Sequence, residues 1–325
     1  MIVKKKRYKL KPDVFLYLFV IVAIVVVINK FYDSYKDHKY KDTLEYKLID
    51  KGYTKDDIKL LSKYYNNKEL TKLSKKKKDR ELLELMNNKM YIHSNLNDYL
   101  TYIDLNPNKS VDDAISVVNL HLNYDSYEKT FLADTSKNEL VLVNKYYNLP
   151  EGYTPDNLVT ISQKYSWGDL GSQKVKEEVF DAFMQMHQDA EANGIYLMIQ
   201  SSYKSFEQLE SIYERNCNAY GEAVCETFLS KAGFNEIQTG YTLDIFSLKN
   251  SLQSTFKDSE TYAWLKDNAY KYGFIIRYPE GKEKITKIDF MPWHFRYVGK
   301  EAAEKIYNDN ISFEEYYIYN IEIKK

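Results

Sequence analysis

Ten residues near the C-terminus, FMPWHFRYVG at 290–299, are the most informative about the fold. Pro292 interrupts this stretch, because proline lacks the backbone N–H that a central strand needs. After it, the mostly apolar and aromatic run from His294 to Val298 predicts a short strand, and residues 285–290 predict another before it. A second stretch, GFNEIQTGYTLD at 233–244, ends in an acidic residue that is a candidate for chemistry.

The segments around these two stretches alternate between strand and helix patterns. Short apolar runs predict buried strands at 139–144, 195–200 and 274–278. Longer segments with apolar residues at helical spacing predict helices at 174–192, 206–220 and 259–272. Helices interspersed with antiparallel strands are typical of an α+β domain, which we place at residues 115–325.

Five short blocks resemble, in this order along the chain, those of the VanY-type D-alanyl-D-alanine carboxypeptidases. These zinc peptidases remove the terminal D-alanine from peptidoglycan stem peptides. The blocks are LVNK at 142–145, SSYKS at 201–205, EIQTGYTLD at 236–244, YGFIIRYP at 272–279 and PWHFRYVG at 292–299. The resemblance covers residues 115 to 317 and implies a hedgehog/D,D-peptidase-type carboxypeptidase fold.

The resemblance also implies a zinc site. A catalytic zinc ion needs three protein ligands and an open position for the attacking water. The family takes them from a His-x6-Asp pair and a later His, with a Glu three residues before that His as general base. Asp244 and His294 match two ligands, but Ile237 stands at the first histidine and Met291 at the glutamate. Neither of these apolar side chains can perform the missing role, so we expect no catalytic residue in the site.

Recognition of a substrate carboxylate is implied at the SSYKS block. The family uses an arginine there, which can hold a carboxylate through two parallel hydrogen bonds. Lys204 stands in its place and keeps the charge without the planar fork. By the same matching, the other candidate substrate-binding residues are Ser202, Tyr203, Gln238 and Thr239.

Two interpretations of Asp244 and His294 remain open. They are either ligands of a vestigial zinc site or a hydrogen-bonded pair inside an inherited pocket, which we favour. A rearranged zinc site needs a new donor. Asp289 would face the same side of a strand as Met291, whereas Glu236 would point away from the face of Ile237 if the backbone is extended. We therefore expect no cofactor. If a rearranged metal site exists, its cofactor is zinc.

The N-terminus has the pattern of a membrane anchor. Six basic residues crowd positions 4–11, and an almost unbroken apolar run follows over 14–28. Residues 12–29 are long enough to span a bilayer with some tilt. No small-residue cleavage site follows, which favours an uncleaved signal anchor over a cleaved signal peptide. The positive-inside rule then makes 1–11 a cytoplasmic tail and places the C-terminal domain outside a bacterial cell membrane, with a single pass.

Residues 30–114 are polar and rich in Lys, Tyr and Asn, and we predict a small helical stalk there. Thr54 and Ser110 each precede a carboxylate by three residues, a pattern that marks helix starts. The run Lys75 to Lys78 is either a solvated helix face, which we favour, or a contact to anionic wall polymer or lipid. The net charge of −1, from 46 basic and 47 acidic residues, gives no global field for a nucleic acid, and we expect none as a partner.

Two cysteines, Cys217 and Cys225, lie on the predicted extracellular side, where disulfides persist. On one continuous helix they would be about 12 Å apart, which is too far for a disulfide. Gly221 lies midway and would allow the helix to break into a hairpin that brings them together. A disulfide and two buried thiols stay open as alternatives.

Together these features predict a membrane-anchored extracellular protein with a degenerate carboxypeptidase site. We expect an inactive pseudopeptidase that binds cell-wall peptide or a protein partner. One alternative is an active zinc D,D-carboxypeptidase that hydrolyses peptidoglycan stem peptides with a rearranged metal site. The other is a structural or interaction protein whose active part is the stalk.

Overall fold

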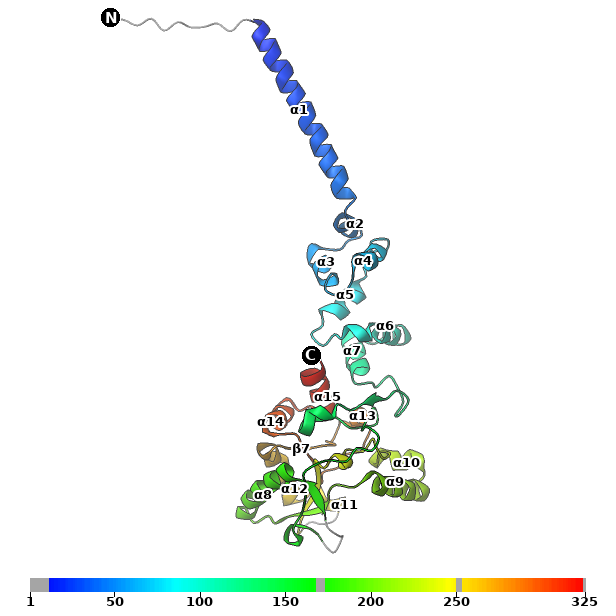
Figure 1. The fold of residues 1–325 in the computed structure, drawn as a ribbon, viewed down its shortest axis with the longest axis vertical. Coiled ribbons are helices and arrows are strands. Elements are labelled where there is room, and N and C mark those ends of the chain that lie inside the picture. Colours follow the sequence, from blue (N-terminus) through cyan, green and yellow to red (C-terminus); the bar gives the residue numbers. More distant parts are fainter. Residues whose placement is uncertain (1–11, 168–172, 250–252, 324–325) are drawn as a thin grey trace, which may run out of the picture. The chain divides into compact units, whose positions relative to one another are not determined.

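The computed structural model describes residues 12–167, 173–249 and 253–323, and the chain divides into two compact units, 1–93 and 94–325. Figure 1 shows the first unit in blue to cyan and the second in green to red. The basic tail predicted at 1–11 lies outside the described residues. We predicted the boundary between the stalk and the peptidase-like domain at 114/115. The second unit begins earlier, at Ser94, and the domain boundary itself stays a prediction.

The first unit starts with a long apolar helix, α1 (Pro12–Lys41). By length and composition its segment Leu16–Lys41 is able to cross a membrane, with a mean hydropathy of 2.0 in its most apolar window. Its side chains from Leu16 onward are exposed almost throughout. The helix contains the span predicted at 12–29 and continues past the apolar run.

Four short helices complete the first unit. They are α2 (Leu44–Asp50), α3 (Lys55–Leu61), α4 (Asn67–Leu73) and α5 (Arg80–Asn87). Thr54 and Asp57 form the capping box that the sequence predicts for α3. The helices enclose a small core that includes Leu48, Leu61 and Leu85. The run Lys75 to Lys78 follows α4 in turns, so the expectation of a helix face there is wrong.

The second unit is built on a four-stranded antiparallel sheet, which confirms the α+β class. Its strand order is β5 (Leu197–Ser201), β6 (Thr242–Ser247), β8 (His294–Tyr297) and β7 (Phe274–Ile276). Two small ladders lie outside it: β1 (Phe131–Leu132) with β2 (Tyr147–Asn148), and β3 (Leu158–Thr160) with β4 (Lys174–Lys176).

The rest of the second unit consists of helices and short helical turns. The α-helices are α6 (Leu96–Leu105), α7 (Val111–Asn119), α8 (Glu177–Ala192), α9 (Phe206–Tyr220), α10 (Glu222–Phe228), α11 (Gln253–Phe256), α12 (Glu260–Asn268), α13 (Glu283–Thr286), α14 (Lys300–Asp309) and α15 (Phe313–Tyr317). The 3₁₀ turns are η1 (His93–Asn95), η2 (Thr135–Leu140), η3 (Gln163–Tyr165), η4 (Glu236–Thr239) and η5 (Ala269–Tyr272), and η6 (Ile318–Glu322) is π-helical. The apolar stripe of α8 and the inward residues of the sheet share one core, as the helical spacing predicts.

Two predicted strands are wrong. Residues 139 and 140 end the turn η2, and the next residues are irregular, because the carbonyls of Glu139 and Val141 accept hydrogen bonds from Arg296, each at 2.9 Å, instead of joining a ladder. Residues 285–290 contain the end of α13 and Lys287 at φ 58°, a left-handed conformation that ends the helix and is not found in a strand.

The conformation of Gly221 allows Cys217 and Cys225 to meet. Its φ of 83° ends α9, and α10 turns back beside it. The hairpin brings the Cα atoms of Cys217 and Cys225 to 5.0 Å, and the two residues form a disulfide. Residues Phe228 to Ser230, directly after α10, line the pocket described next.

Candidate functional site

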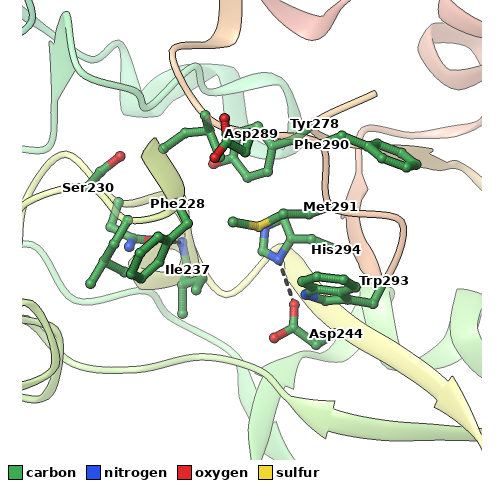
Figure 2. Close-up of a pocket in the computed structure, with 13 residues that line it drawn as sticks. Phe228, Ser230, Ile237, Asp244, Tyr278, Asp289, Phe290, Met291, Trp293 and His294 are labelled. Atoms are coloured by element: carbon green, nitrogen blue, oxygen red, sulfur yellow. Dashed lines mark hydrogen bonds and ion pairs between the residues drawn. The ribbon is translucent and has the colours of Figure 1, made fainter. Parts of the chain in front are cut away.

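A pocket of 390 Å³ opens beside Asp244 of β6 and the start of β8. Figure 2 shows that its centre is bordered by Met291 and His294, with Ile237 and Phe228 facing them. Its lining is Phe228, Leu229, Ser230, Asn235, Ile237, Asp244, Tyr278, Ile288, Asp289, Phe290, Met291, Trp293 and His294. The two stretches that open the sequence analysis therefore meet at one site.

Asp244 and His294 are brought together by strand register. They are directly opposite each other in the antiparallel pair of β6 and β8, which places their side chains on one face of the sheet. The Nδ1 atom of His294 lies 2.6 Å from Oδ1 of Asp244, and Figure 2 marks this contact. The hydrogen-bonded pair that we favoured is present. A role as vestigial zinc ligands stays a prediction.

Ile237 and Met291 stand in this pocket where the resemblance places a zinc ligand and a general base. Both are half-buried and both contribute to the lining. They do not fill the pocket, whose volume remains 390 Å³. Two of the positions that the resemblance assigns to metal binding and catalysis are therefore apolar in this pocket.

Glu236 points away from Ile237, as expected, although its backbone is not extended. It belongs to the 3₁₀ turn η4 rather than to an extended segment, and its side chain is buried. Oε2 accepts a hydrogen bond from Nε of Arg277 at 2.6 Å and lies 3.4 Å from Nη1 of Arg296. Oε1 lies 3.5 Å from Nε2 of His294, an ion-pair distance without a hydrogen bond.

The charges continue beyond Glu236 into a buried network. Arg277 forms a two-pronged pair with Glu314 of α15, at 3.0 and 2.7 Å, and Glu314 also accepts a hydrogen bond from Asn144. With His294 protonated, the network has three cations and three carboxylates, which are His294, Arg277, Arg296, Asp244, Glu236 and Glu314. We call this set the buried charge network. Its charges sum to zero, which makes burial tolerable.

The network shifts the pKa values of its members. Burial opposes ionisation of Glu236, but Arg277 and Arg296 outweigh it and lower the pKa of the carboxyl to about 2. Burial also opposes a charge on His294, yet Asp244 and Glu236 outweigh it and raise its pKa to about 9. At neutral pH His294 is therefore an imidazolium that donates from Nδ1 to Asp244 and presents its other N–H toward Glu236.

Zinc does not fit this donor set. The carboxylates of Asp244 and Glu236 face opposite ring nitrogens of His294, so they do not converge on one point. Ile237 offers no lone pair. Asp289, the other donor considered, is drawn in Figure 2 across the Met291 thioether from Asp244. Over residues 12–167, 173–249 and 253–323, no three His, Cys, Asp or Glu side chains are grouped to hold a metal ion.

Three of the five candidate substrate-binding residues form internal hydrogen bonds. Ser202 donates to Gln173 at 2.7 Å, and Thr239 donates to the carbonyl of Glu236 at 2.6 Å. Gln238 bridges the backbone of Gly233 and Tyr153, at 3.2 Å each. These bonds give the three residues structural roles, while their role in substrate binding stays a prediction.

Lys204 and Tyr203 are the two candidates with partly open side chains. The ammonium of Lys204 lies 3.5 Å from both Oε1 of Gln173 and the carbonyl of Ser202. Burial lowers the pKa of Lys204, and the nearby charge of Asp244 works against that shift. Lys204 does not line the pocket itself, but its closeness to Asp244 makes it the candidate best placed to offer a positive charge to a ligand that reaches past Asp244.

Sequence reasoning missed the groups that support the site from behind. Arg277 and Tyr278 were assigned only to a strand, yet the ring of Tyr278 stacks on His294 with centroids 5.2 Å apart. Glu314, the partner of Arg277, is remote in the sequence and has no local signal. The charged residues at Arg277 and Arg296, inside otherwise apolar strands, were the available clue, because buried arginines need carboxylate partners.

The comparisons with known proteins concern the part of the chain that contains this site. The family model for VanY, D-alanyl-D-alanine carboxypeptidase, matches residues 172–300. A putative carboxypeptidase, YodJ of Bacillus subtilis, is 39% identical over 184 residues, which are 56% of this chain and 67% of that protein. A D-alanyl-D-alanine carboxypeptidase of Enterococcus faecalis is 33% identical over 195 residues, 56% of this chain and 67% of that protein.

A solved structure is similar in the same region. The LdcB LD-carboxypeptidase, whose structure is described as revealing the molecular basis of peptidoglycan recognition, aligns with a TM-score of 0.54. The two are 37% identical, over 58% of this chain and 89% of that one. The chain belongs to the VanY family of D-alanyl-D-alanine carboxypeptidases, and it has the fold of that family.

The first prediction concerns Glu236. Glu236→Gln should lower the free energy of unfolding of the second unit by about 3–5 kcal/mol, because it leaves buried arginines with too little negative charge. Urea unfolding followed by tryptophan fluorescence measures this, since all three tryptophans lie in residues 94–325. Glu222→Gln, at an exposed ion pair with Lys231, is the control and should change stability by less than about 1 kcal/mol. Equal effects of the two changes would contradict the assignment.

The second prediction concerns pH. The pKa of His294 is about 9 in the folded state, against an ordinary value of 6.5, so its protonation stabilises the fold fully below pH 6.5. That contribution, about 3 kcal/mol at most, should be lost as the pH rises from 6.5 through 9. Asp244→Asn should make the free energy of unfolding fall less steeply over this pH range. Comparing the free energies of the variant and the unchanged protein at each pH cancels the contribution of the other titrating groups. A decline of equal slope in both would show that the pair is not its source.

Proposed function

We propose that this chain is a membrane-anchored extracellular protein whose peptidase-like pocket binds cell-wall peptide or a protein partner without hydrolysing it. The observation that supports this most strongly is the apolar pair Ile237 and Met291 in the pocket lining. They occupy the positions where the family has a zinc ligand and its general base. Loss of a general base alone typically costs about 10²–10⁴-fold in rate. Loss of a ligand also removes the metal that activates water.

A peptide that ends in a free carboxylate is the ligand that the pocket favours. Lys204 is partly open, and the charge of its neighbour Asp244 is already met by His294. The likeness to the LdcB structure, described in terms of peptidoglycan recognition, supports a cell-wall peptide as the ligand class. The aromatic and apolar lining offers contact area for the rest of the peptide.

The helix α1 supports a membrane anchor for this domain. The basic residues before it favour a cytoplasmic N-terminus and an extracellular second unit. In this arrangement the domain faces the cell wall and remains tied to the membrane of a bacterial cell with a single pass. The disulfide of Cys217 and Cys225 supports the same orientation, because disulfides persist outside the cytoplasm.

The third prediction tests hydrolysis. The full chain, purified in detergent, should contain far less than one zinc ion per chain and release no D-alanine from a stem pentapeptide, with the Enterococcus faecalis enzyme as positive control. Ile237→His with Met291→Glu should restore zinc binding if the pocket keeps its shape, most of it through the histidine. Stoichiometric zinc together with turnover in the unchanged chain would favour the alternative, an active D,D-carboxypeptidase with a rearranged site.

The fourth prediction tests binding. A stem peptide with a free C-terminal carboxylate should bind about tenfold more tightly than its amide, because Lys204 supplies a charge-assisted contact. Lys204→Met should abolish this difference in calorimetric titrations, whereas Lys300→Met, which removes an exposed lysine at the start of α14, should preserve it. If neither peptide binds the intact chain, a protein partner or a role of the stalk becomes the better explanation.

A further inference from the structure

Charge is divided very unevenly between residues 30–93 of the first unit and the whole second unit. Residues 30–93 contain 17 basic and 11 acidic residues, a net charge of +6. Residues 94–325 contain 23 basic and 35 acidic residues, a net charge of −12. The near-neutral total therefore conceals a basic region that follows the apolar run of α1. Such a region attracts anions independently of the peptidase-like pocket.

The basic residues of the first unit converge on an open hollow of 590 Å³. Four of its six lining residues are cationic and one is acidic. The lining is Asp50, Lys51, Gly52, Lys77, Lys78 and Arg80, and we call it the basic hollow. Lys75 and Lys76 are exposed beside it in the chain. The concavity and the charge thus coincide at one place.

The fold builds this hollow from two turns that are joined by backbone hydrogen bonds. The amide of Lys78 donates to the carbonyl of Lys51 at 3.0 Å, which ties the turn after α4 to the turn after α2. The amide of Asp79 donates to the hydroxyl of the buried Tyr53, also at 3.0 Å. Gly52, at φ 97°, makes the tight turn beside Lys78. The shape of the hollow is therefore fixed by the backbone.

The cations of the hollow differ in what they already contact. Lys78 pairs with Asp57, and Lys51 pairs with Asp50 at 3.0 Å. Within the described part of the first unit, Lys77 and Arg80 have no carboxylate within 4.0 Å, and both are exposed. The paired lysines support the walls, and these two residues leave positive charge available to a ligand.

Phosphate groups fit this arrangement best. Arginine and lysine are the side chains that bind phosphate most strongly, through charge-assisted hydrogen bonds. Several exposed cations in sequence around an open hollow match a repeated anion better than one compact ion. The chemistry therefore indicates a linear polymer with phosphate in its backbone.

A bilayer surface is the weaker candidate. The helix α1 continues from Asn29 to Lys41 after the apolar run, and these thirteen residues rise about 20 Å. That exceeds twice the Debye length of about 8 Å at physiological ionic strength, so the charge of lipid headgroups is largely screened at that distance. The hollow lies still further along the chain.

We propose that the basic hollow binds a linear phosphate polymer on the outer side of the membrane and so fixes the first unit in the cell envelope. The location of the polymer rests on the proposed orientation. The binding itself does not depend on the state of the peptidase-like pocket.

The fifth prediction uses the full chain in non-ionic detergent and fluorescently labelled inorganic polyphosphate as the probe. Fluorescence anisotropy should show saturable binding that weakens as salt is added. Lys77→Glu with Arg80→Glu should lower the affinity about tenfold or more. A glutamate at position 80 suits the first turn of α5, so the fold should be kept, which circular dichroism checks.

Lys63→Glu with Lys68→Glu is the matched control, because it makes the same change of net charge at exposed sites outside the hollow. It should reduce affinity less than about twofold. Equal losses in the two variants would overturn the proposal, since binding would then depend on net charge alone. Loss of polyphosphate binding when phosphatidylglycerol is added to the detergent micelles, but not when neutral phosphatidylcholine is added, would overturn it in favour of lipid. Failure here leaves the peptide-binding proposal untouched, because that is measured with Lys204.

Discussion

The rest of the second unit depends on the ion pairs of one buried carboxylate, that of Glu236. It meets Arg277, Arg296 and His294, which lie at or beside the ends of β7 and β8. A buried charge without partners is very costly, so each of these groups requires the others. Through Arg277 the network reaches Glu314 in α15, near the end of the described chain. The C-terminal helix and the wall of the pocket are thus held by one set of charges.

In this arrangement, the residues that hold the fold together differ from those at the two positions where the resemblance places a zinc ligand and a general base. Glu236 and Ile237 are neighbours in η4, yet Glu236 points into the buried charge network while Ile237 lines the pocket. Met291 likewise lines the pocket and has no ion pair to lose. The side chains at these two positions carry no charge that the network needs, so the groups that fix the fold do not depend on them. His294 links the two sides, because it lines the pocket while its protonated ring pairs with Asp244 and faces Glu236.

Much of this fold was predictable where local signals and tertiary contacts agree. The capping boxes at Thr54 and Ser110, the break at Gly221 and the strand after Pro292 all follow from backbone chemistry within a few residues. The site pair was predictable from motif matching, and strand register then brought it together. The failures lie where the local signal is incomplete. Residues 139–144 look like a strand, but the carbonyls of Glu139 and Val141 bind Arg296, a partner 155 positions or more away that no local pattern reveals. Glu236 points away from Ile237 as expected, but it does so from a 3₁₀ turn and not from the extended backbone assumed for it.

The charge distribution shows why a sum over the whole chain misleads. Fields in salt solution decay within about 8 Å, so a residue responds to its own surroundings and not to the total of −1. The second unit has a net charge of −12, whereas residues 30–93 of the first unit have a net charge of +6. A cation near Asp244, such as Lys204, and the cations of the basic hollow each act over about a Debye length. The binding preferences proposed for the two units can therefore differ, because each depends on the charges within that distance of its own site.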